Sequence, residues 1–422
     1  MLHNCIKIGS YAPVKGISVR RRILLKYWRG YLVALIFTVF SWALSQFAAA
    51  HTKLLDMTYP YMTRVLQSGL ADWSGGMEFC VWQVLFLFGI LALLAGIVLM
   101  VALRWNPVQM LGWVLAVVAI VNFLSNGLYG LNQYNSSIAE DMRITSYDSS
   151  LTSLENATTY YLEQATALAS KVERTGMGTV KSVKFATQAK QAANGFQNLV
   201  KRDHYPVFAG STAPVKELGW AEYYTEQGIT GKTVGLTGEA AVNPNVPAVA
   251  MPYAMCKEMA KRMSITRESD ANFAAYMACT ANDDVNFQYS GALLAFRYCY
   301  NALIADSSTE GRAAYKRVKS AIPSQVKSDM AQYDEFLGEN GKGVENDTVT
   351  LLVNWHIQSV ILPKQQEEQA EDKILLFDPL DESDPRLAEI VNPTDKIGIV
   401  AKNEAAKNEA TTNPTTATTP AG

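Results

Sequence analysis

The sequence predicts a mainly α-helical membrane protein with three N-terminal transmembrane helices, a helix-rich outer domain and a disordered C-terminal tail. Three long apolar stretches lie within the first 130 residues. Helix-type spacing of apolar residues then recurs through roughly residue 358, and the chain ends in a tract of Thr, Pro, Ala and Gly. The 422 residues are enough for one membrane module and one sizeable soluble domain.

Each apolar stretch is long enough to cross a bilayer. The stretches cover residues 31–50, 79–103 and about 110–130, and none of them carries a charged residue. About 20 residues at ~1.5 Å each span the roughly 30 Å of hydrocarbon. We therefore define a membrane module over residues 31–130, preceded by a basic segment of residues 1–30.

Basic residues set the expected orientation. Seven of them precede the first span, which places the N-terminus in the cytoplasm: Lys7, Lys15, Arg20, Arg21, Arg22, Lys26 and Arg29. Three crossings then put everything after about Gly130 outside, so we expect a multi-pass plasma-membrane protein. A competing interpretation makes the first stretch a cleaved signal peptide ending at Ala48, Ala49 and Ala50, which leaves the final topology unchanged.

Residues 51–78 form an outer loop between the first two spans. Apolar residues from Tyr59 to Leu70 recur at helix-like spacing, and Trp73 follows them. The segment is either a helix at the membrane interface or a cap on the outer domain, and the sequence leaves both interpretations open.

The outer domain is expected over residues 131–362. Helical patterns cover residues 152–174 and 185–202, and helical periodicity returns from about 253 to 358. Between Asp203 and Pro252 the composition shifts to Gly, Pro, Thr and Val, which predicts loops and short strands.

The last segment, residues 363–422, is highly charged and of low complexity. Lys402 to Ala406 nearly repeats as Lys407 to Ala410. Such a segment buries too little apolar surface to offset its ordering entropy, so we expect disorder.

The overall charge argues against a nucleic-acid partner. The formal net charge is −2, and no basic stripe occurs beyond the N-terminus. The partner that the sequence does predict is the lipid bilayer.

An ordered set of short segments carries a resemblance to a known family. The segments are Gly228-Ile229-Thr230-Gly231, Gly238 to Asn243, the run Cys256 to Cys279, Phe287 to Gly291, and Phe296 to Leu303. Over roughly residues 20–355 the chain resembles the bacterial membrane family called domain of unknown function 3810. Its members look like membrane-anchored zinc metallopeptidases of the gluzincin type. The resemblance implies an α-rich, gluzincin-like outer domain.

The resemblance also exposes a substitution at the metal site that it implies. Where the family carries His-Glu-x-x-His, this chain has Lys257-Glu258-Met259-Ala260-Lys261. A family glutamate corresponds to Asp270, and a glycine usually stands at Ser264. Lys257, Lys261 and Asp270 are therefore former metal-ligand positions, and Glu258 is a vestigial general base.

The exchange of imidazole for ammonium removes the chemistry that zinc needs. Catalytic zinc takes about three protein ligands and one open position for water. A lysine ammonium has three donors and no acceptor. We therefore expect no cofactor here, although the family implies zinc. Our hypothesis is that the two ammonium groups replace the metal charge and pair with Glu258, Asp270 or Glu268.

These observations lead to an expected function. The outer domain is predicted to be inactive as a peptidase and to act as a binding or regulatory module for an envelope protein or peptide. Candidates for lining the old cleft are Asn272, Tyr276, Arg297 and Tyr298. Two alternatives are an active membrane-bound metallopeptidase with an unrecognised metal site and a purely structural membrane component.

Three cysteines fall in the outer domain: Cys256, Cys279 and Cys299. In a gluzincin-like helix pair, the antiparallel second helix brings Cys279 near Cys256. The outer compartment permits a disulfide between them, while Cys299 stays free. The alternative is that the two thiols pack as small buried side chains.

Overall fold

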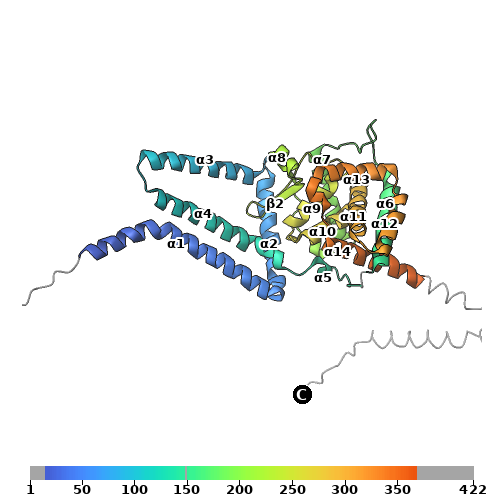
Figure 1. The fold of residues 1–422 in the computed structure, drawn as a ribbon, viewed down its shortest axis with the longest axis horizontal. Coiled ribbons are helices and arrows are strands. Elements are labelled where there is room, and N and C mark those ends of the chain that lie inside the picture. Colours follow the sequence, from blue (N-terminus) through green and yellow to red (C-terminus); the bar gives the residue numbers. More distant parts are fainter. Residues whose placement is uncertain (1–14, 148–149, 368–422) are drawn as a thin grey trace, which may run out of the picture. The chain divides into compact units, whose positions relative to one another are not determined.

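The computed structural model describes residues 15–147 and 150–367 (Figure 1). By internal contacts the chain divides into a unit of residues 1–358 and a second unit of residues 359–422. The described part is mainly α-helical, as the sequence predicts. The expected disordered tail lies outside the described residues from 368 onward, whereas residues 363–367 are helical.

Three helices are long and apolar enough to cross a membrane. They are α1 (Lys15–Ala50), α3 (Val81–Ala102) and α4 (Pro107–Leu128), with the apolar part of α1 running from Tyr27 to Ala50. The three predicted spans are thus confirmed as candidate membrane helices. The turn before α4 follows from local chemistry, because Pro107 opens the helix and the Asn106 side chain accepts from the backbone N–H groups of Val108 and Gln109.

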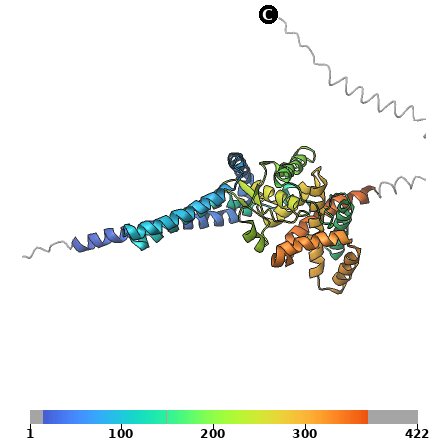
Figure 2. The ribbon, with the colours of Figure 1, turned by 90° about the horizontal axis from the view of Figure 1, so that it is seen from above.

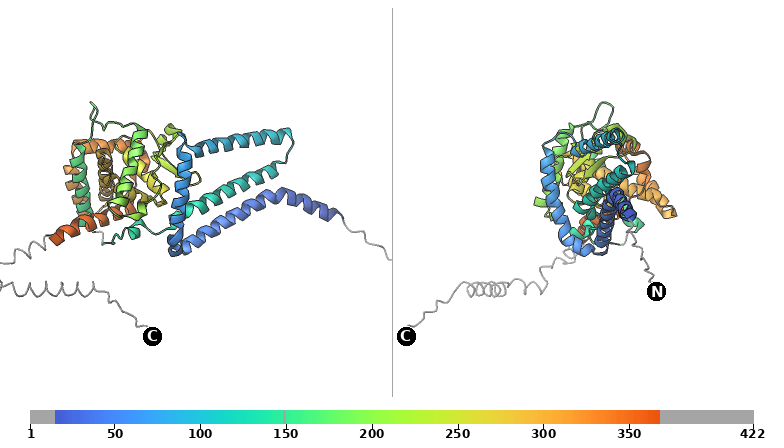
Figure 3. Two further views of the ribbon diagram at one scale, coloured as in Figure 1. Left: turned by 180° about the vertical axis from the view of Figure 1, so that it is seen from behind. Right: turned by 90° about the vertical axis from the view of Figure 1, so that its left-hand side faces the viewer.

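The helices α1 and α4 pack side by side, and α3 diverges from them (Figures 1 and 3). The two backbones come closest at Gly30, where an added Cβ would lie 2.4 Å from the carbonyl carbon of Gly112. Ala116 and Ala119 of α4 are also buried. Small residues let membrane helices approach in this way. Within the described residues α3 makes no extensive helix–helix contact.

The outer loop is a long helix, α2 (Thr52–Gly75). One face is buried and consists of Thr63, Gln67, Ala71 and Ser74. Thr63 bonds to Ser264, Gln67 donates to the carbonyl of Gly235, and the backbone of Ala71 lies against Gly238. Of the two interpretations that the sequence left open, these contacts are those of a cap on the outer domain. The other side of α2 exposes large apolar side chains: Leu54, Met57, Tyr61, Met62, Val65 and Trp73.

The outer domain is built from helices around one apolar core (Figure 2). Its helices are η1 (Gly130–Tyr134), α5 (Ile138–Asp141), α6 (Leu151–Ala169), α7 (Phe185–Lys201), η2 (Pro206–Phe208), α8 (Ala221–Glu226), α9 (Met251–Arg262), α10 (Glu268–Thr280), α11 (Val285–Ala305), α12 (Thr309–Ala321), α13 (Ser324–Leu337), η3 (Gly338–Lys342), α14 (Asn346–His356) and η4 (Ile357–Ile361). The short helix η3 separates α13 from α14.

Helix α10 lies at the centre of this core. Its residues from Ser269 to Cys279 are all buried, and it packs against α7, α9, α11 and α14. The approach to α7 is so close that a Cβ added to Gly195 would lie 1.9 Å from the carbonyl oxygen of Ala278. A glycine inside α7, unfavourable for helix propensity, is explained by this contact.

A small sheet lies between the helices and the membrane module. It contains β1 (Lys216–Glu217), β2 (Gly231–Val234) and β3 (Glu239–Val242) in the order β1-β3-β2. Strand β1 pairs parallel to β3, whereas β2 pairs antiparallel with Gly231 opposite Val242. These strands fall in the segment where the composition predicts loops and short strands.

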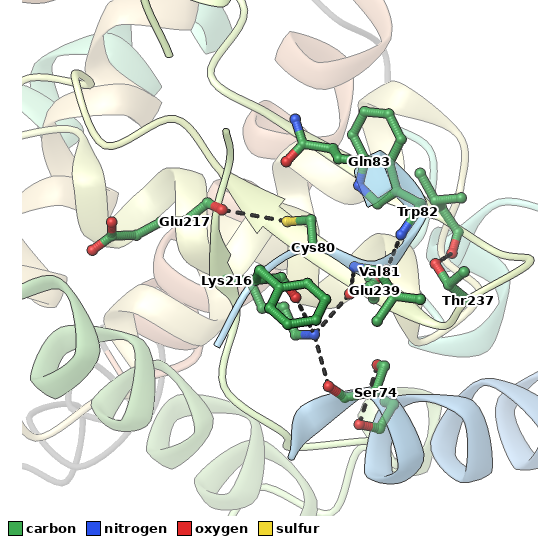
Figure 4. A network of polar contacts seen from close by, with 12 residues as sticks. Ser74, Cys80, Val81, Trp82, Gln83, Lys216, Glu217, Thr237 and Glu239 are labelled. Atoms are coloured by element: carbon green, nitrogen blue, oxygen red, sulfur yellow. Dashed lines mark hydrogen bonds and ion pairs between the residues drawn. The ribbon is translucent and has the colours of Figure 1, made fainter. Parts of the chain in front are cut away.

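A buried ion pair joins this sheet to the start of α3 (Figure 4). Lys216 Nζ lies 2.7 Å from Glu239 Oε1 and also donates to the carbonyls of Ser74 and Phe79. The Glu239 carboxylate accepts from the backbone N–H groups of Val81 and Trp82, at 2.8 and 2.9 Å. It thus binds the positive end of the α3 dipole. We refer to Lys216, Glu239 and these backbone groups as the membrane joint.

Candidate functional site

The site begins at the tight turn between α9 and α10. Ser264 stands in this turn with φ +70°, a left-handed conformation that glycine adopts at least cost. This explains why a glycine is expected at the position. The Ser264 hydroxyl lies 2.8 Å from that of Thr63 on α2, so the strained turn is tied to the outer-loop helix.

The turn brings Glu268, the first residue of α10, between the two lysines of α9. Lys257 and Lys261 both form ion pairs with Glu268, the latter at 2.9 Å. The Glu268 side chain is 49% exposed, whereas the side chains of Lys257 and Lys261 are only 14% and 20% exposed. We call Lys257, Lys261, Glu258 and Glu268 the ion cluster. It lies at the surface of the domain, with its two ammonium groups partly covered.

Glu258 forms the inner side of the ion cluster. Its carboxylate lies 3.4 Å from Lys261 Nζ and accepts from the Thr233 hydroxyl of β2 at 2.8 Å. The side chain is 1% exposed and lies directly against β2. A Cβ added to Gly231 would lie 2.6 Å from Glu258 Cγ, so only glycine leaves room for this carboxylate. The motif Gly228 to Gly231 thus has a physical reason.

The charges of the ion cluster stabilise one another. Burial acts to lower the pKa of Lys257, but the surrounding negative charges, Glu268 foremost, raise it above its usual value. Burial acts to raise the pKa of Glu268, and the two lysines nevertheless lower it to about 2. Lys257 is therefore an ammonium group and Glu268 an ionised carboxylate at neutral pH.

Asp270 does not belong to this cluster. Its carboxylate accepts from the Ser137 hydroxyl at 2.9 Å and from the backbone N–H of Ile138 at 3.1 Å. It therefore binds the start of the short helix α5, and burial raises its pKa. Of the three partners hypothesised for the lysines, Glu268 and Glu258 are confirmed and Asp270 is wrong. The reason is that residues two apart on a helix point about 200° apart.

The four candidate cleft residues lie inside the domain. Asn272 donates to Thr348, Tyr276 packs edge-to-face against Tyr161 in the core, and Arg297 pairs with Asp334. Tyr298 is 9% exposed and the other three less. These side chains are core residues, and the expectation that they line an open cleft is wrong, because α10 and α11 are enclosed on nearly all sides.

The cysteine pair is adjacent but reduced. Cys256 and Cys279 are buried free thiols, and each lies close enough to influence the other. The predicted proximity is confirmed, while the structure corresponds to the alternative of two packed thiols rather than to the disulfide. Burial raises the pKa of the Cys279 thiol. Cys299 is also buried and free.

The residues of the ion cluster do not fit a zinc ion. Two of its four side chains are ammonium groups, and the raised pKa of Lys257 keeps its nitrogen lone pair protonated. The side chains of Lys257 and Lys261 also lie directly against the Glu268 carboxylate, where a metal ion would have to bind it. Across residues 15–147 and 150–367 no group of three or more His, Cys, Asp or Glu side chains is arranged to hold a metal.

Two residues outside the sequence motif complete the site. The Tyr129 hydroxyl, just after α4, donates to the carbonyl of Lys261 at 2.8 Å, and Thr233 donates to Glu258. The sequence analysis missed both, because neither belongs to a recognisable spacing. It named Glu268 as one of three possible partners of the lysines but did not predict that this carboxylate binds both of them. For this residue there was a signal: it is a carboxylate in the first turn of the helix that follows the lysines.

The comparisons with known proteins agree with the resemblance read from the sequence. No curated protein and no solved structure matched the chain. A family profile described as "Protein of unknown function (DUF3810)" matches residues 56–354, which include most of α2, the candidate membrane helices α3 and α4, and the ion cluster. Because this match covers most of the 422 residues, the chain belongs to the DUF3810 family.

Proposed function

We propose that this protein is a membrane-anchored, catalytically inactive relative of gluzincin-type zinc peptidases, whose outer domain acts as a binding or regulatory module in the envelope. The observation that carries the proposal is the placement of Glu268 between Lys257 and Lys261. In this arrangement internal charges take the place that a zinc ion has in an active relative. The helix pair can therefore keep its geometry without metal.

The retained parts of the site favour binding over a purely structural role. Glu258 keeps its place against Gly231 and Thr233, and the Glu268 carboxylate remains half exposed. The site thus presents charged groups at the surface, where a peptide or an envelope protein can reach them. A purely structural component has no need of such an exposed cluster.

Orientation is part of the same proposal. The seven basic residues before Tyr31 favour a cytoplasmic N-terminus, so the outer domain lies outside the plasma membrane. Helix α2 forms hydrogen bonds to Ser264 and Gly235 of the outer domain. These contacts support placing α2 and the domain on the same side of the membrane. A cysteine at the exposed Met177 should react with an impermeant maleimide in intact cells. The matched variant Trp105→Cys, in the turn between α3 and α4, should react only after lysis.

The decisive experiment measures metal and hydrolysis together. The full chain, purified in detergent without a histidine tag, should contain no stoichiometric zinc by plasma mass spectrometry and should not cleave fluorescent casein. The variant Glu258→Gln is the control for any residual cleavage. About one zinc per chain, with cleavage that the Glu258→Gln variant abolishes, would overturn the proposal.

A further inference from the structure

A polar cavity of about 730 Å³ lies between α1, α4 and the turn between β2 and β3. Its lining is unusual for a membrane helix pair. The side facing the spans consists of Thr38, Ser41, Trp42, Ser45, Gln46, Asn122, Ser125 and Asn126. The other side consists of Tyr129, Gly130, Tyr134 and the β2–β3 segment from Lys232 to Leu236. We call this cavity the polar groove.

Part of this polarity holds α1 and α4 together. Asn126 donates to the hydroxyl of Ser45 at 2.8 Å and to Ser41, and the Ser41 hydroxyl donates to Asn122 Oδ1 at 3.1 Å. Such bonds are a common means of helix association in membranes. They account for Ser41, Ser45 and Asn126 without any ligand.

Other polar groups of the groove are not explained by helix association. Within the described residues, the side chains of Thr38 and Gln46 and the amide nitrogen of Asn122 make no hydrogen bond, and all three residues are exposed. Thr38 precedes the end of α1 at Ala50 by twelve residues, or about 18 Å along the helix. Unpaired polar groups at that depth of the hydrocarbon are costly. The groove therefore requires a polar occupant.

The charge of the groove selects the kind of occupant. Lys232 is the one ionisable side chain among the lining residues other than the two tyrosines, and no carboxylate lines the cavity. Its ammonium group lies 5.2 Å from the centre of the Trp82 ring, near the start of α3. The remaining polar groups are amides and hydroxyls, which donate to phosphate and ester oxygens. A headgroup with a negative charge fits this lining.

The position of the groove selects a lipid rather than a soluble anion. Its inner wall is formed by the candidate membrane helices α1 and α4, and Trp42 and Asn122 in this wall are exposed. A molecule in the bilayer thus reaches the groove laterally. We infer that the polar groove binds the headgroup of an anionic phospholipid from the leaflet on the domain side, with the phosphate at Lys232 and its acyl chains in the bilayer.

The groove also touches the ion cluster. Thr233 lines the groove and donates to Glu258, and Tyr129 lines it and donates to the carbonyl of Lys261. An occupied groove therefore fixes two side chains that hold the ion cluster in place. This inference stands whether or not the outer domain has lost peptidase activity, since it uses no residue of the cluster itself.

The test uses the full chain in detergent micelles and native mass spectrometry. Phosphatidylglycerol should bind with one-to-one stoichiometry and more tightly than phosphatidylcholine. The variant Lys232→Gln should bind phosphatidylglycerol about fivefold more weakly, as expected for the loss of one lysine contact to an anionic lipid. The matched control is Lys53→Gln on α2, an exposed lysine outside the groove, which should leave binding unchanged.

Further measurements distinguish an anionic lipid from other possible occupants of the polar groove. The variant Asn122→Leu should also weaken phosphatidylglycerol binding, because it removes the amide nitrogen that makes no hydrogen bond within the described residues. Glycerol 3-phosphate should not compete; if it displaces the lipid at equal concentration, the site is one for soluble phosphates and the inference fails. The inference is also overturned if phosphatidylglycerol and phosphatidylcholine bind equally well, or if Lys53→Gln weakens phosphatidylglycerol binding as much as Lys232→Gln does. Melting curves of each variant verify that the chain is folded.

Discussion

The outer domain contains two lysine–glutamate clusters that differ in their access to solvent. In the membrane joint, the Lys216 and Glu239 side chains are 9% and 0% exposed, and nearby backbone groups complete their hydrogen bonds. In the ion cluster, Glu268 is half exposed and serves two lysines at once. The first cluster is buried with its hydrogen bonds complete, whereas the second is partly open to solvent and has one carboxylate shared by two lysines.

This difference separates a sealed ion pair from an accessible one. A buried ion pair is costly unless its geometry is complete, and the membrane joint meets that condition. The ion cluster is accessible enough for a partner to compete for Glu268 or for the lysines. The same pair of residue types thus anchors a membrane helix in one place and forms a surface site in the other.

The largest effect should follow from breaking the membrane joint. Glu239→Gln leaves the buried ammonium of Lys216 without its counter-charge and weakens the cap on α3. We expect a loss of about 3–5 kcal/mol in the free energy of unfolding, the usual cost of breaking a buried pair. Thermal and urea melting of the full chain in detergent, followed by circular dichroism, measures it.

The double variant Lys216→Met with Glu239→Gln is the control for this experiment. It removes both charges and should recover part of the lost stability. If the single variant melts like the parent, the joint is hydrated and the contrast with the ion cluster disappears.

A second test converts the open cluster into a metal site. Lys257→His with Lys261→His replaces both ammonium groups with ligands, and Glu268 already faces them from α10. We expect zinc to bind at one per chain, at least tenfold more tightly than to the parent, because three ligands then converge. Isothermal titration of the purified chain with zinc measures the affinity.

Two additions identify the third ligand in that background. Glu268→Gln should abolish the gained affinity, whereas Asp270→Glu should leave it unchanged because Asp270 binds at Ser137 and Ile138. A gain that depends on residue 270 instead would show that the turn rearranges when the lysines are removed.

The pH dependence of stability offers a smaller effect with a defined sign. The pKa of Glu268 in the folded protein is about 2, below its ordinary value of 4.5. Its contribution is therefore fully present above pH 4.5 and is lost as the pH falls from there toward 2. The loss of thermal stability between pH 4.5 and 2 should be smaller in the Glu268→Gln variant than in the parent protein. An equal loss in both proteins would mean that the open cluster adds no stability.

The smallest effect concerns the thiols behind the open cluster. Cys256 precedes Lys257 and is fully buried, and burial raises the pKa of its neighbour Cys279. We expect both to resist alkylation in the native protein and to react after unfolding, without prior reductant. Mass spectrometric peptide mapping measures this. A linked Cys256–Cys279 peptide in unreduced protein would restore the disulfide interpretation.

The periodicity of the sequence predicted the architecture more accurately than the site. The three spans could be predicted from uncharged stretches because hydrocarbon tolerates few structures other than an apolar helix. The start of α7 at Phe185 is also as expected. The helix in the outer loop is longer than the predicted segment 59–70, because polar residues such as Thr52 and Ser74 continue it. Helix α6 ends at Ala169, before Arg174, where the chain turns into a short bridge with Val180.

The site could be located from the sequence but not assembled from it. The turn at Ser264 was expected from the family resemblance, and the structure has a left-handed turn at this residue. For the lysines the sequence offered three carboxylates, of which the structure pairs Glu258 and Glu268 with them. Which carboxylate faces the lysines depends on the rotation of α10 about its own axis, and that is set by core packing. Tyr129 and Thr233 come from distant segments, so only the fold brings them to the cluster.

The membrane joint also implies an order of biosynthesis. Residues 81–102 leave the ribosome well before Lys216 and Glu239. Helix α3 therefore enters the bilayer before the residues that bind its first turn have been synthesised. Until β1 and β3 pair, the amides of Val81 and Trp82 have no carboxylate to bind. Closure of the joint is thus a late step of assembly, after which the first turn of α3 and the strands are held as one piece.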